Sequence, residues 1–425
     1  MAKIVVAHPG RQHSYRLATS LKKSDDLFCY ITTVYNKKKP SLLTMVASMI
    51  LKGDGKKRLR YRSCKELEDN DVIQFCESRG FVETLLARHN KKLYAKYRQK
   101  TADKFGKKVA KFAIKNKVDA VICYDTNATA CFEVLKKYAP NIVRILDCSA
   151  AAAPYVRFLY EKELLLSKDN SLKNENLRFW NKNSIVDGQK EIDISNYFLV
   201  ASNFVKRSLI YSGVDDTKIK IIPYGANIYS DIIKKIEHKC LKFLFVGNVN
   251  YNKGVPYLLK AVSELRDCSL TVVGAYDKNA EYIKSYLDDP KITFVGCVTF
   301  DKVKYYYENA DVFVIDSFAE GMAQVGIEAM ACGLPIICSE NSGVNDIVTD
   351  GISGFVIPCG DLEALKEKMQ WFINNKNKVL QMGESARTTA ENYTWGEYEK
   401  KVSVAVRDIM TTKNNIEEYS VDCLV

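Results

Sequence analysis

The first part of the chain alternates between short apolar runs and segments with helical periodicity. The apolar run "KIVVAH" (3–8) is followed by a glycine turn, the helical segment "SYRLATSLKK" (14–23) and a second apolar run, "LFCYITTVY" (27–35). A strand, a helix and a strand in this order are typical of the start of a parallel sheet. We therefore expect the N-terminal residues to begin an α/β domain.

This rhythm is interrupted between residues 37 and 117, where two basic stretches predict a helical insertion. Apolar strand patterns resume at 119–125 and 142–147, and one more strand and helix are indicated at 196–213. The segment "IIPYGANI" (221–228) then leads away from this domain. Its Pro-Tyr-Gly step predicts a domain boundary.

From Lys242 onward the alternation is more regular. Six runs rich in Val, Ile and Phe, from "KFLFVG" (242–247) to "GFVIP" (354–358), are separated by segments with helical periodicity. This pattern is typical of a doubly wound parallel sheet. The predicted fold class is therefore α/β, with two Rossmann-like doubly wound domains that face a cleft.

The same patterns predict where the domains begin and end. We expect an N-terminal domain at 1–223, a second domain at 224–392 and a C-terminal segment at 393–425. A helical stretch at 395–410 is expected to cross back to the first domain. Ligands of such sheets bind beyond the carboxyl ends of the strands, so the loops after strands are where we look for chemistry.

Composition narrows the class of protein. Hydrophobic residues make up 47% and charged residues 27% of the 425, which is close to the average of globular proteins. The longest apolar stretch, at 42–51, is about half of the roughly 20 residues that cross a bilayer, and the first residues lack the pattern of a secretory signal. The 13 cysteines form no Cys-x-x-Cys pair, which suits a reducing cytoplasm.

The net charge of +12 is concentrated in two segments. Residues 36–65 hold ten Lys or Arg against one acid, and residues 91–117 hold eleven against one, so these segments carry +19 and the rest of the chain −7. An apolar decad at 42–51 precedes the first basic cluster, a composition suited to an anionic membrane surface. We therefore expect peripheral attachment to the inner face of a membrane, the alternative being a solvated helix face.

A possible phosphate site follows the first strand of the second domain. In "FVGNVNYNKGVPYLL", the strand ends at Gly247 and Lys253-Gly254 precede a helix. Free amides at a helix N-terminus, together with a lysine, suit a diphosphate. No Gly-x4-Gly-Lys-[Ser/Thr] or Gly-x-Gly-x-x-Gly motif follows a strand, so a P-loop phosphotransferase and a nicotinamide dehydrogenase lose their main support.

Two carboxylates flank the start of a later helix. In "DSFAEGMAQVGIEAMACG", Glu320 lies in a strand-to-helix loop, and Glu328 lies about one turn into the helix. A carboxylate accepts two hydroxyl protons at once, which suits the vicinal diol of a ribose or a sugar. The alternative is a capping glutamate and a glutamate on the helix surface.

Four stretches, at 201–228, 245–261, 310–339 and 350–365, together resemble the retaining glycosyltransferases of GT-B architecture, the group 1 glycosyltransferases. The resemblance extends over residues 201–365 and is looser in the N-terminal half. It implies that Lys253 binds the donor diphosphate, Glu320 the hydroxyls of the transferred sugar and Glu328 the nucleotide ribose. The full set of donor-binding residues that it implies is Gly247, Asn248, Lys253, Cys297, Val298, Glu320, Gly321, Met322, Ala323, Gln324 and Glu328.

The resemblance fails at one position and is indistinct in the first domain. The family usually has arginine directly after the strand glycine, where this chain has Asn248. The turn after the first strand resembles the acceptor-side loop, so the acceptor-side candidates are Gly10, Arg11 and His13. Arg11 is also a candidate to replace the missing arginine. The catalytic candidates are Glu320, Lys253, His8 and Asp147.

The function that this resemblance implies is transfer of a sugar, with retention of configuration, from a nucleotide-sugar donor to a glycan or lipid-linked acceptor. We expect a role in the synthesis of cell-surface polysaccharide, with no metal and no cofactor, since cations and helix dipoles stabilise the leaving diphosphate. One alternative is a sugar-nucleotide epimerase on the same fold. Another is a basic nucleic-acid or membrane-binding protein without catalysis, although no nucleic-acid-reading module is recognisable.

Overall fold

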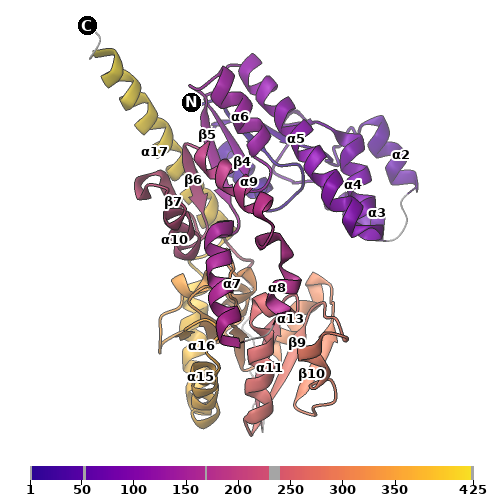
Figure 1. Ribbon diagram of the computed structural model, residues 1–425, viewed down its shortest axis with the longest axis vertical. Helices are drawn as coiled ribbons and strands as arrows, with labels where there is room; N and C mark the ends of the chain where they lie inside the picture. The colour runs from indigo at the N-terminus through magenta and orange to yellow at the C-terminus, as the bar shows by residue number, and fades with distance from the viewer. Residues whose placement is uncertain (1, 51–53, 168–169, 229–239, 423–425) are drawn as a thin grey trace.

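The computed structural model describes residues 2–50, 54–167, 170–228 and 240–422. Two domains, each a parallel sheet with helices on both faces, are stacked along the long axis of the molecule (Figure 1). The predicted fold of two Rossmann-like domains is confirmed.

The first sheet has the strand order β3-β2-β1-β4-β5-β6-β7. Its strands are β1 (Ile4–Ala7), β2 (Leu27–Thr32), β3 (Val72–Gln74), β4 (Ala120–Tyr124), β5 (Val143–Cys148), β6 (Tyr197–Val200) and β7 (Ile219–Ile221). Its helices are α1 (Ser14–Lys23), α2 (Leu42–Ile50), α3 (Asp54–Arg60), α4 (Glu77–His89), α5 (Lys91–Lys115), α6 (Thr129–Tyr138), α7 (Ala153–Ser167), α8 (Ser171–Glu175), α9 (Lys182–Asp193) and α10 (Asn203–Tyr211). All of the strand pairs are parallel, and the order reverses between β1 and β4.

The second sheet has the order β10-β9-β8-β11-β12-β13, which reverses between β8 and β11. Its strands are β8 (Leu241–Val246), β9 (Cys268–Val273), β10 (Ile292–Gly296), β11 (Val312–Ile315), β12 (Ile336–Ser339) and β13 (Gly354–Ile357). The remaining helices are α11 (Val255–Glu264), α12 (Glu281–Lys284), α13 (Phe300–Glu308), α14 (Gln324–Ala331), α15 (Leu362–Asn374), α16 (Lys376–Ala390) and α17 (Trp395–Asp422). The predicted boundary at residue 223 lies between the two sheets.

The structure corrects the predicted helical insertion at 37–117. Within it, β3 pairs with β2 and extends the sheet by one strand at its edge. A second unpredicted strand, β7, forms the opposite edge. Each of these strands has three residues, which is too short for an alternating pattern to be recognised.

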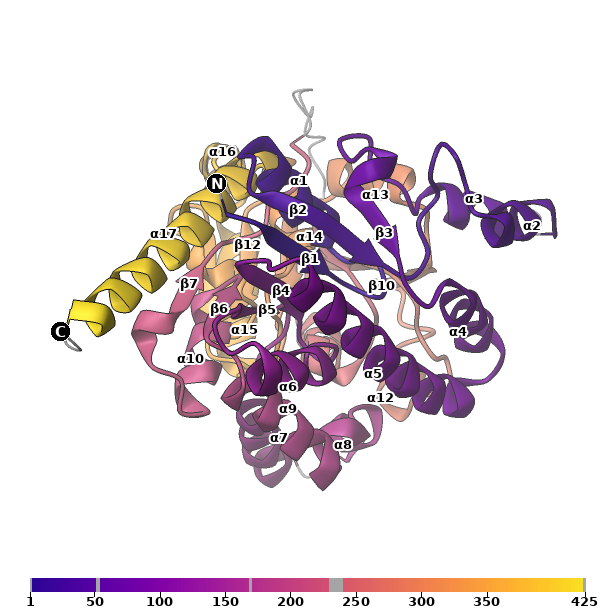
Figure 2. The same ribbon diagram turned by 90° about the horizontal axis from the view of Figure 1, so that it is seen from above.

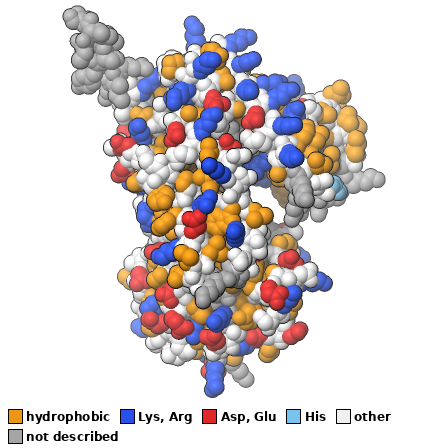
Figure 3. Space-filling view, in the orientation of Figure 1, with side chains coloured by type: hydrophobic (Ala, Val, Ile, Leu, Met, Phe, Trp, Pro, Cys, Tyr) orange, Lys and Arg blue, Asp and Glu red, His pale blue; other side chains and the backbone are white. Residues whose placement is uncertain are grey.

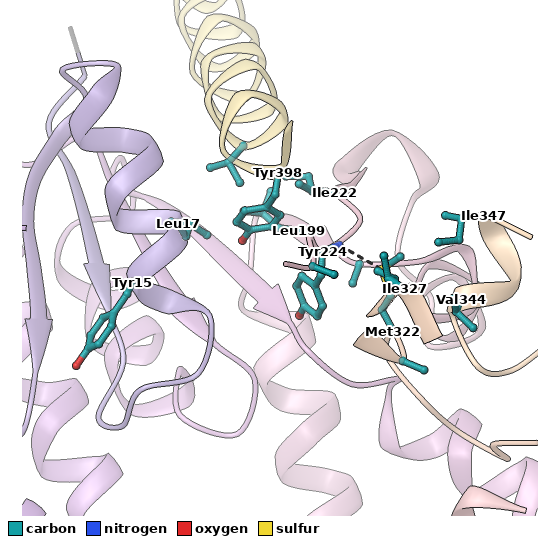
Figure 4. Packing of buried hydrophobic residues seen from close by; sticks show 14 of the residues in the cluster. Tyr15, Leu17, Leu199, Ile222, Tyr224, Met322, Ile327, Val344, Ile347 and Tyr398 are labelled. Carbon is teal, nitrogen blue, oxygen red and sulfur yellow. Dashed lines mark hydrogen bonds between the residues drawn. The ribbon is translucent and has the colours of Figure 1, made fainter. Parts of the chain in front are cut away.

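One apolar core continues from the first domain into the second. On the face of the first sheet that carries α1 and α17, buried residues include Tyr224 and Tyr398, and the same cluster reaches Met322 and Ile327 at α14 (Figure 4). The backbone N–H of Tyr224 donates a hydrogen bond of 3.2 Å to the Sδ atom of Met322. Burial of this shared core holds the two domains together.

The C-terminal helix α17 returns to the first domain, where it packs against α1. The hydroxyls of Ser20 and Ser403 lie 2.9 Å apart at this contact. At the start of the return, Ala226 donates from its backbone N–H to the carbonyl of Tyr393 at 2.9 Å. A Cβ atom on Gly225 would lie 2.4 Å from the backbone of Thr394, so the two connecting segments touch.

Helices α2 and α3 (residues 42–50 and 54–60) form a lobe that stands away from the body of the first domain (Figure 2). Leu42, Met49 and Ile50 of α2 are 78%, 74% and 72% exposed. The hydroxyl of Thr44, the one buried residue of α2, donates to the carboxylate of Glu77 on α4 at 2.6 Å. Among the described helices, none combines the length and the hydropathy that crossing a membrane requires.

Candidate active site

A cavity of about 450 Å³ opens at the carboxyl ends of the second sheet's strands, where the strand order reverses. This is the place at which α/β sheets bind ligands. It is lined by Val246, Gly247, Asn248, Lys253, Val273, Gly274, Ala275, Cys297, Val298, Val303, Glu320, Met322, Ala323, Gln324 and Val325. Nine of the eleven donor-side residues therefore lie on its wall, and the other two, Gly321 and Glu328, belong to the bordering loop and helix.

The loop after β8 fixes Lys253. The side-chain oxygen of Asn250 accepts a hydrogen bond of 3.0 Å from the backbone N–H of Lys253. Gly254 has φ +68°, and a Cβ atom there would lie 2.0 Å from the carbonyl oxygen of Asp316, so only glycine lets the loop pack against the end of β11. The lysine is thereby directed into the cavity from a rigid turn.

The ammonium of Lys253 pairs with the carboxylate of Glu320. Burial lowers the pKa of Lys253 to about 8, because removal from water disfavours the charged form. The pair places one cation and one anion on the wall of the same cavity, at the predicted positions of the diphosphate and the transferred sugar.

The Glu320 loop is held at both ends by backbone contacts. The N–H of Glu320 donates to the carbonyl of Asn341 at 3.1 Å, and the N–H of Ala323 donates to that of Ser342 at 3.0 Å. Helix α14 begins directly afterwards at Gln324, so its N-terminal amides face the cavity wall. Such amides favour negatively charged ligands.

Glu328 lies on α14, where its Oε2 atom accepts a hydrogen bond of 3.3 Å from the hydroxyl of Tyr307 on α13. Burial raises the pKa of Glu328, and the tyrosine opposes this shift only in part. One carboxylate oxygen is therefore oriented by the tyrosine, a residue that the sequence did not single out.

The first domain contributes a second polar group, formed by the turn after β1 and the end of β5. The Nε2 atom of His13 lies 3.1 and 3.0 Å from the two carboxylate oxygens of Asp147, one residue before the end of β5. The rings of Tyr124 and Tyr224 enclose His13, with centroids 5.2 and 4.5 Å away. Two residues that the sequence singled out separately thus form one buried pair.

His8 does not join this pair. Its Nδ1 atom accepts a hydrogen bond of 2.8 Å from the backbone N–H of Gly10. Burial lowers the pKa of His8 to about 4, so the ring is neutral at physiological pH. Gly10 and the exposed Arg11 follow in the same turn at the end of β1.

The loop after β5, in the first domain, meets the Glu320 loop of the second domain at the domain boundary. A Cβ atom on Gly321 would lie 2.0 Å from the carbonyl oxygen of Ser149, in the loop after β5. The hydroxyl of Ser202 donates to the carbonyl of Gly321 at 2.6 Å. The loop that follows Asp147 therefore lies directly against the loop that carries Glu320.

Helix α7 also reaches the second domain, which the sequence did not indicate. The hydroxyl of Tyr160 bonds to the side chain of Asn252, and the buried carboxylate of Glu163 accepts from the hydroxyls of Tyr251, at 3.3 Å, and Tyr257. These contacts brace the Lys253 loop from the first domain. A further cavity of about 410 Å³ lies in the first domain between α5, α9 and the loops after β4 and β5.

Residues 230–389 match the protein family described as Glycosyl transferases group 1. The second domain therefore matches the group 1 glycosyltransferase family. The resemblance that the sequence motifs showed is thereby confirmed, and the candidate donor residues lie within the matched glycosyltransferase region.

Individual glycosyltransferases are similar to this chain over about half of its length. The chain is 28% identical over 249 residues to an uncharacterised glycosyltransferase of Methanocaldococcus jannaschii, covering 57% of this chain and 65% of that protein. It is 28% identical over 216 residues to the capsular polysaccharide biosynthesis glycosyltransferase CapM of Staphylococcus aureus, covering 46% and 56%. The matches thus span about three fifths of the length of these relatives.

A solved structure shares the fold of nearly the whole chain. The structure of HepE from Anabaena, in complex with UDP, superposes with a TM-score of 0.61 at 14% identity and covers 96% of this chain and 100% of that one. At this identity the similarity shows the fold, with both domains in the GT-B arrangement.

Proposed function

We propose that this protein is a retaining glycosyltransferase, which moves a sugar from a nucleotide-sugar donor to a glycan or lipid-linked acceptor. The observation that carries the proposal is the Lys253–Glu320 pair on the wall of the 450 Å³ cavity, beside the N-terminus of α14. CapM is named for capsular polysaccharide biosynthesis, and this supports a role in cell-surface polysaccharide synthesis.

In this mechanism, Lys253 and the amides at the start of α14 hold the donor diphosphate and stabilise its charge as the glycosidic bond breaks. Glu320 accepts hydrogen bonds from the sugar hydroxyls, and Glu328 binds the ribose. The acceptor hydroxyl attacks from the side of the leaving diphosphate, whose oxygen takes the proton, so configuration is retained. No metal or organic cofactor takes part in this scheme, and Asn248 contributes a hydrogen bond in place of the family's arginine charge.

Binding of the nucleotide alone tests the donor site. In a panel of nucleoside diphosphates, we expect the one with the matching base to raise the melting temperature of the protein. UDP is the first choice because HepE binds it. Glu328→Ala should weaken that binding about ten- to a hundredfold, because it removes hydrogen bonds to a charged acceptor. Isothermal titration measures the affinity, and Glu308→Ala on the neighbouring helix is the control. A panel in which no nucleotide binds contradicts the proposal.

We further propose that the protein works in the cytoplasm, at the anionic inner surface of a membrane, with the lobe of residues 42–50 and 54–60 as its contact. Lys and Arg side chains gather over the first domain, and apolar side chains cover the end of the lobe (Figure 3). The exposed lysines of α5 (Lys100, Lys104, Lys107, Lys108, Lys111 and Lys115) add positive charge along the same domain. Apolar insertion combined with cationic attraction is the usual basis of interfacial binding.

The double variant Met49→Glu/Ile50→Glu should reduce binding to vesicles of phosphatidylglycerol and phosphatidylcholine by at least about tenfold. Each buried side chain of this size contributes about 1.5–3 kcal/mol, and each new charge repels the anionic lipid. Vesicle sedimentation measures the effect, and Leu380→Glu, an exposed apolar position on the second domain, is the control. Sedimentation equal to that of the unchanged protein would refute the membrane contact.

A further inference from the structure

The turn after β1 contains a buried hydrogen-bond donor that has no partner. His8 is 6% exposed, and its Nδ1 atom accepts from Gly10, so the ring proton resides on Nε2. Within the described structure, this Nε2 atom contacts no hydrogen-bond acceptor. A buried donor without an acceptor costs about 1–3 kcal/mol, so an acceptor supplied by a ligand would recover this free energy.

The turn itself is rigidly placed. The hydroxyl of Thr33 donates to the carbonyl of Pro9 at 2.6 Å, and the hydroxyl of Thr32 donates to that of Gly10 at 3.2 Å. These bonds tie the turn to the end of β2, while β4 flanks β1 on the other side. The unpartnered donor of His8 therefore lies in a preformed position in the middle of the sheet's carboxyl edge.

Two arginines flank this turn. Arg62 approaches from the β2 side, where its carbonyl accepts from the backbone N–H of Asn36 at 2.8 Å. Arg98 of α5 approaches from the β4 side, where its Nη2 atom lies 3.4 Å from the hydroxyl of Thr126. Both charges act on the His8 ring, where they lower its pKa in the same direction as burial does.

Neither arginine is neutralised by a carboxylate in contact with it. Arg62 makes one side-chain hydrogen bond, 3.4 Å long, to the hydroxyl of Thr84, and across the described residues neither guanidinium lies within ion-pair distance of an acid. The nearby Glu83 is affected by both charges, but burial raises its pKa and so disfavours its ionised form. Two guanidinium groups that contact no carboxylate among the described residues therefore stand beside the turn.

We propose that this turn binds an anionic group of the acceptor substrate, through the Nε2–H of His8 and the guanidinium groups of Arg62 and Arg98. The inference rests on the proposed function, since it assigns the first domain to the acceptor. The donor diphosphate has its own cation, Lys253, in the other domain. Arg98 also lines the 410 Å³ cavity together with Tyr94 and Phe179, which gives room for the rest of an acceptor next to its charged group.

The anion that fits best is a phosphate or diphosphate. A planar guanidinium forms paired hydrogen bonds with phosphate oxygens, and two guanidinium groups around one neutral N–H donor match the several oxygens of such a group. This chemistry occurs in a lipid-linked sugar diphosphate and also in a free phosphorylated acceptor. The test therefore compares inorganic pyrophosphate, farnesyl diphosphate and neutral farnesol.

The titrations use the Lys253→Ala background, in which pyrophosphate cannot use the donor lysine. We expect both diphosphates to bind, and R62Q/R98Q to weaken each by at least about tenfold, because charge-assisted hydrogen bonds are lost. K136Q/K137Q removes the same charge from the exposed surface of α6 and should leave both affinities unchanged. The Nε2–H signal of His8, assigned by its loss in H8Q, should shift on addition of pyrophosphate. Tighter binding of farnesyl diphosphate than of pyrophosphate identifies a lipid-linked acceptor. Equal affinities for the two ligands show that the site recognises the anionic group alone.

Equal diphosphate affinity in R62Q/R98Q and in the Lys253→Ala parent would overturn the inference. Diphosphate binding that leaves the His8 signal unmoved would overturn it as well. With Lys253 intact, R62Q/R98Q should change nucleoside diphosphate affinity by no more than about twofold, since the sites are separate. A large loss there would assign the arginines to the donor and also overturn the inference. Failure of the proposed function would give a different result, because the unchanged protein would then bind no nucleotide.

Discussion

Replacing Lys253 with alanine is expected to lower the rate of sugar transfer by about a hundred- to a thousandfold. The lysine is the cation on the cavity wall beside Glu320, and removing one preorganised group that stabilises a developing negative charge has an effect of this size. Steady-state transfer with the donor identified by nucleotide binding measures it. Lys260→Ala, an exposed lysine on the following helix α11, is the matched control.

The rate of the unchanged enzyme should also depend on pH through this group. Burial lowers the pKa of Lys253 to about 8, so the side chain is charged below that pH and neutral above it. Donor kcat/KM should therefore be highest below about pH 8 and should fall as the pH rises further, because kcat/KM reports the free enzyme. A near-normal rate for Lys253→Ala, with no alkaline fall, would show that another cation such as Arg11 holds the diphosphate.

Glu320→Gln is expected to reduce transfer about a hundredfold while leaving nucleoside diphosphate affinity unchanged or slightly higher. The amide offers one accepting oxygen in place of two, and its NH2 group donates, so it fits a pair of sugar hydroxyls less well than the carboxylate does. Interactions made in the transition state affect turnover most. The variant also releases Lys253 from its ion pair, which leaves that charge to the diphosphate. Glu328→Gln is the comparison, measured by both titration and turnover.

The two glutamate variants should thus differ in their affinity for the nucleotide. Glu328→Gln is expected to weaken the nucleotide, whereas Glu320→Gln is expected to spare it. Identical losses of nucleotide affinity in both variants would contradict the division of roles between the transferred sugar and the ribose.

The sequence predicted the second domain well because its signals are local. All but one of the strands of that sheet are apolar runs followed by an α-helix, and Lys253 and Glu320 each lie in a loop that directly follows a strand. Loops at the same edge of a parallel sheet necessarily meet, so the sequence was sufficient to bring these two side chains together. The strands β3 and β7 were missed because three residues give no periodic pattern.

The first domain's part of the site could not be predicted to the same extent. His13 and Asp147 are 134 residues apart, and no local pattern links them. The support that α7 gives to the Lys253 loop comes from Tyr160 and Glu163, which in the sequence are ordinary residues of an amphipathic helix. Contacts between such distant residues depend on how the helices and strands pack in the tertiary structure, and the helix or strand propensity of the individual residues does not reveal them.

The chain passes between the domains twice, and both passages lie side by side where Ala226 meets Tyr393 and Gly225 meets Thr394. The two connections between the domains therefore share one line, and a change in the angle between the domains would bend both of them together. Since a Cβ atom on Gly225 would collide with the second passage, a side chain there would alter the angle between the domains without touching either binding site. One small residue in a connecting segment thus constrains how the two sheets are placed against each other.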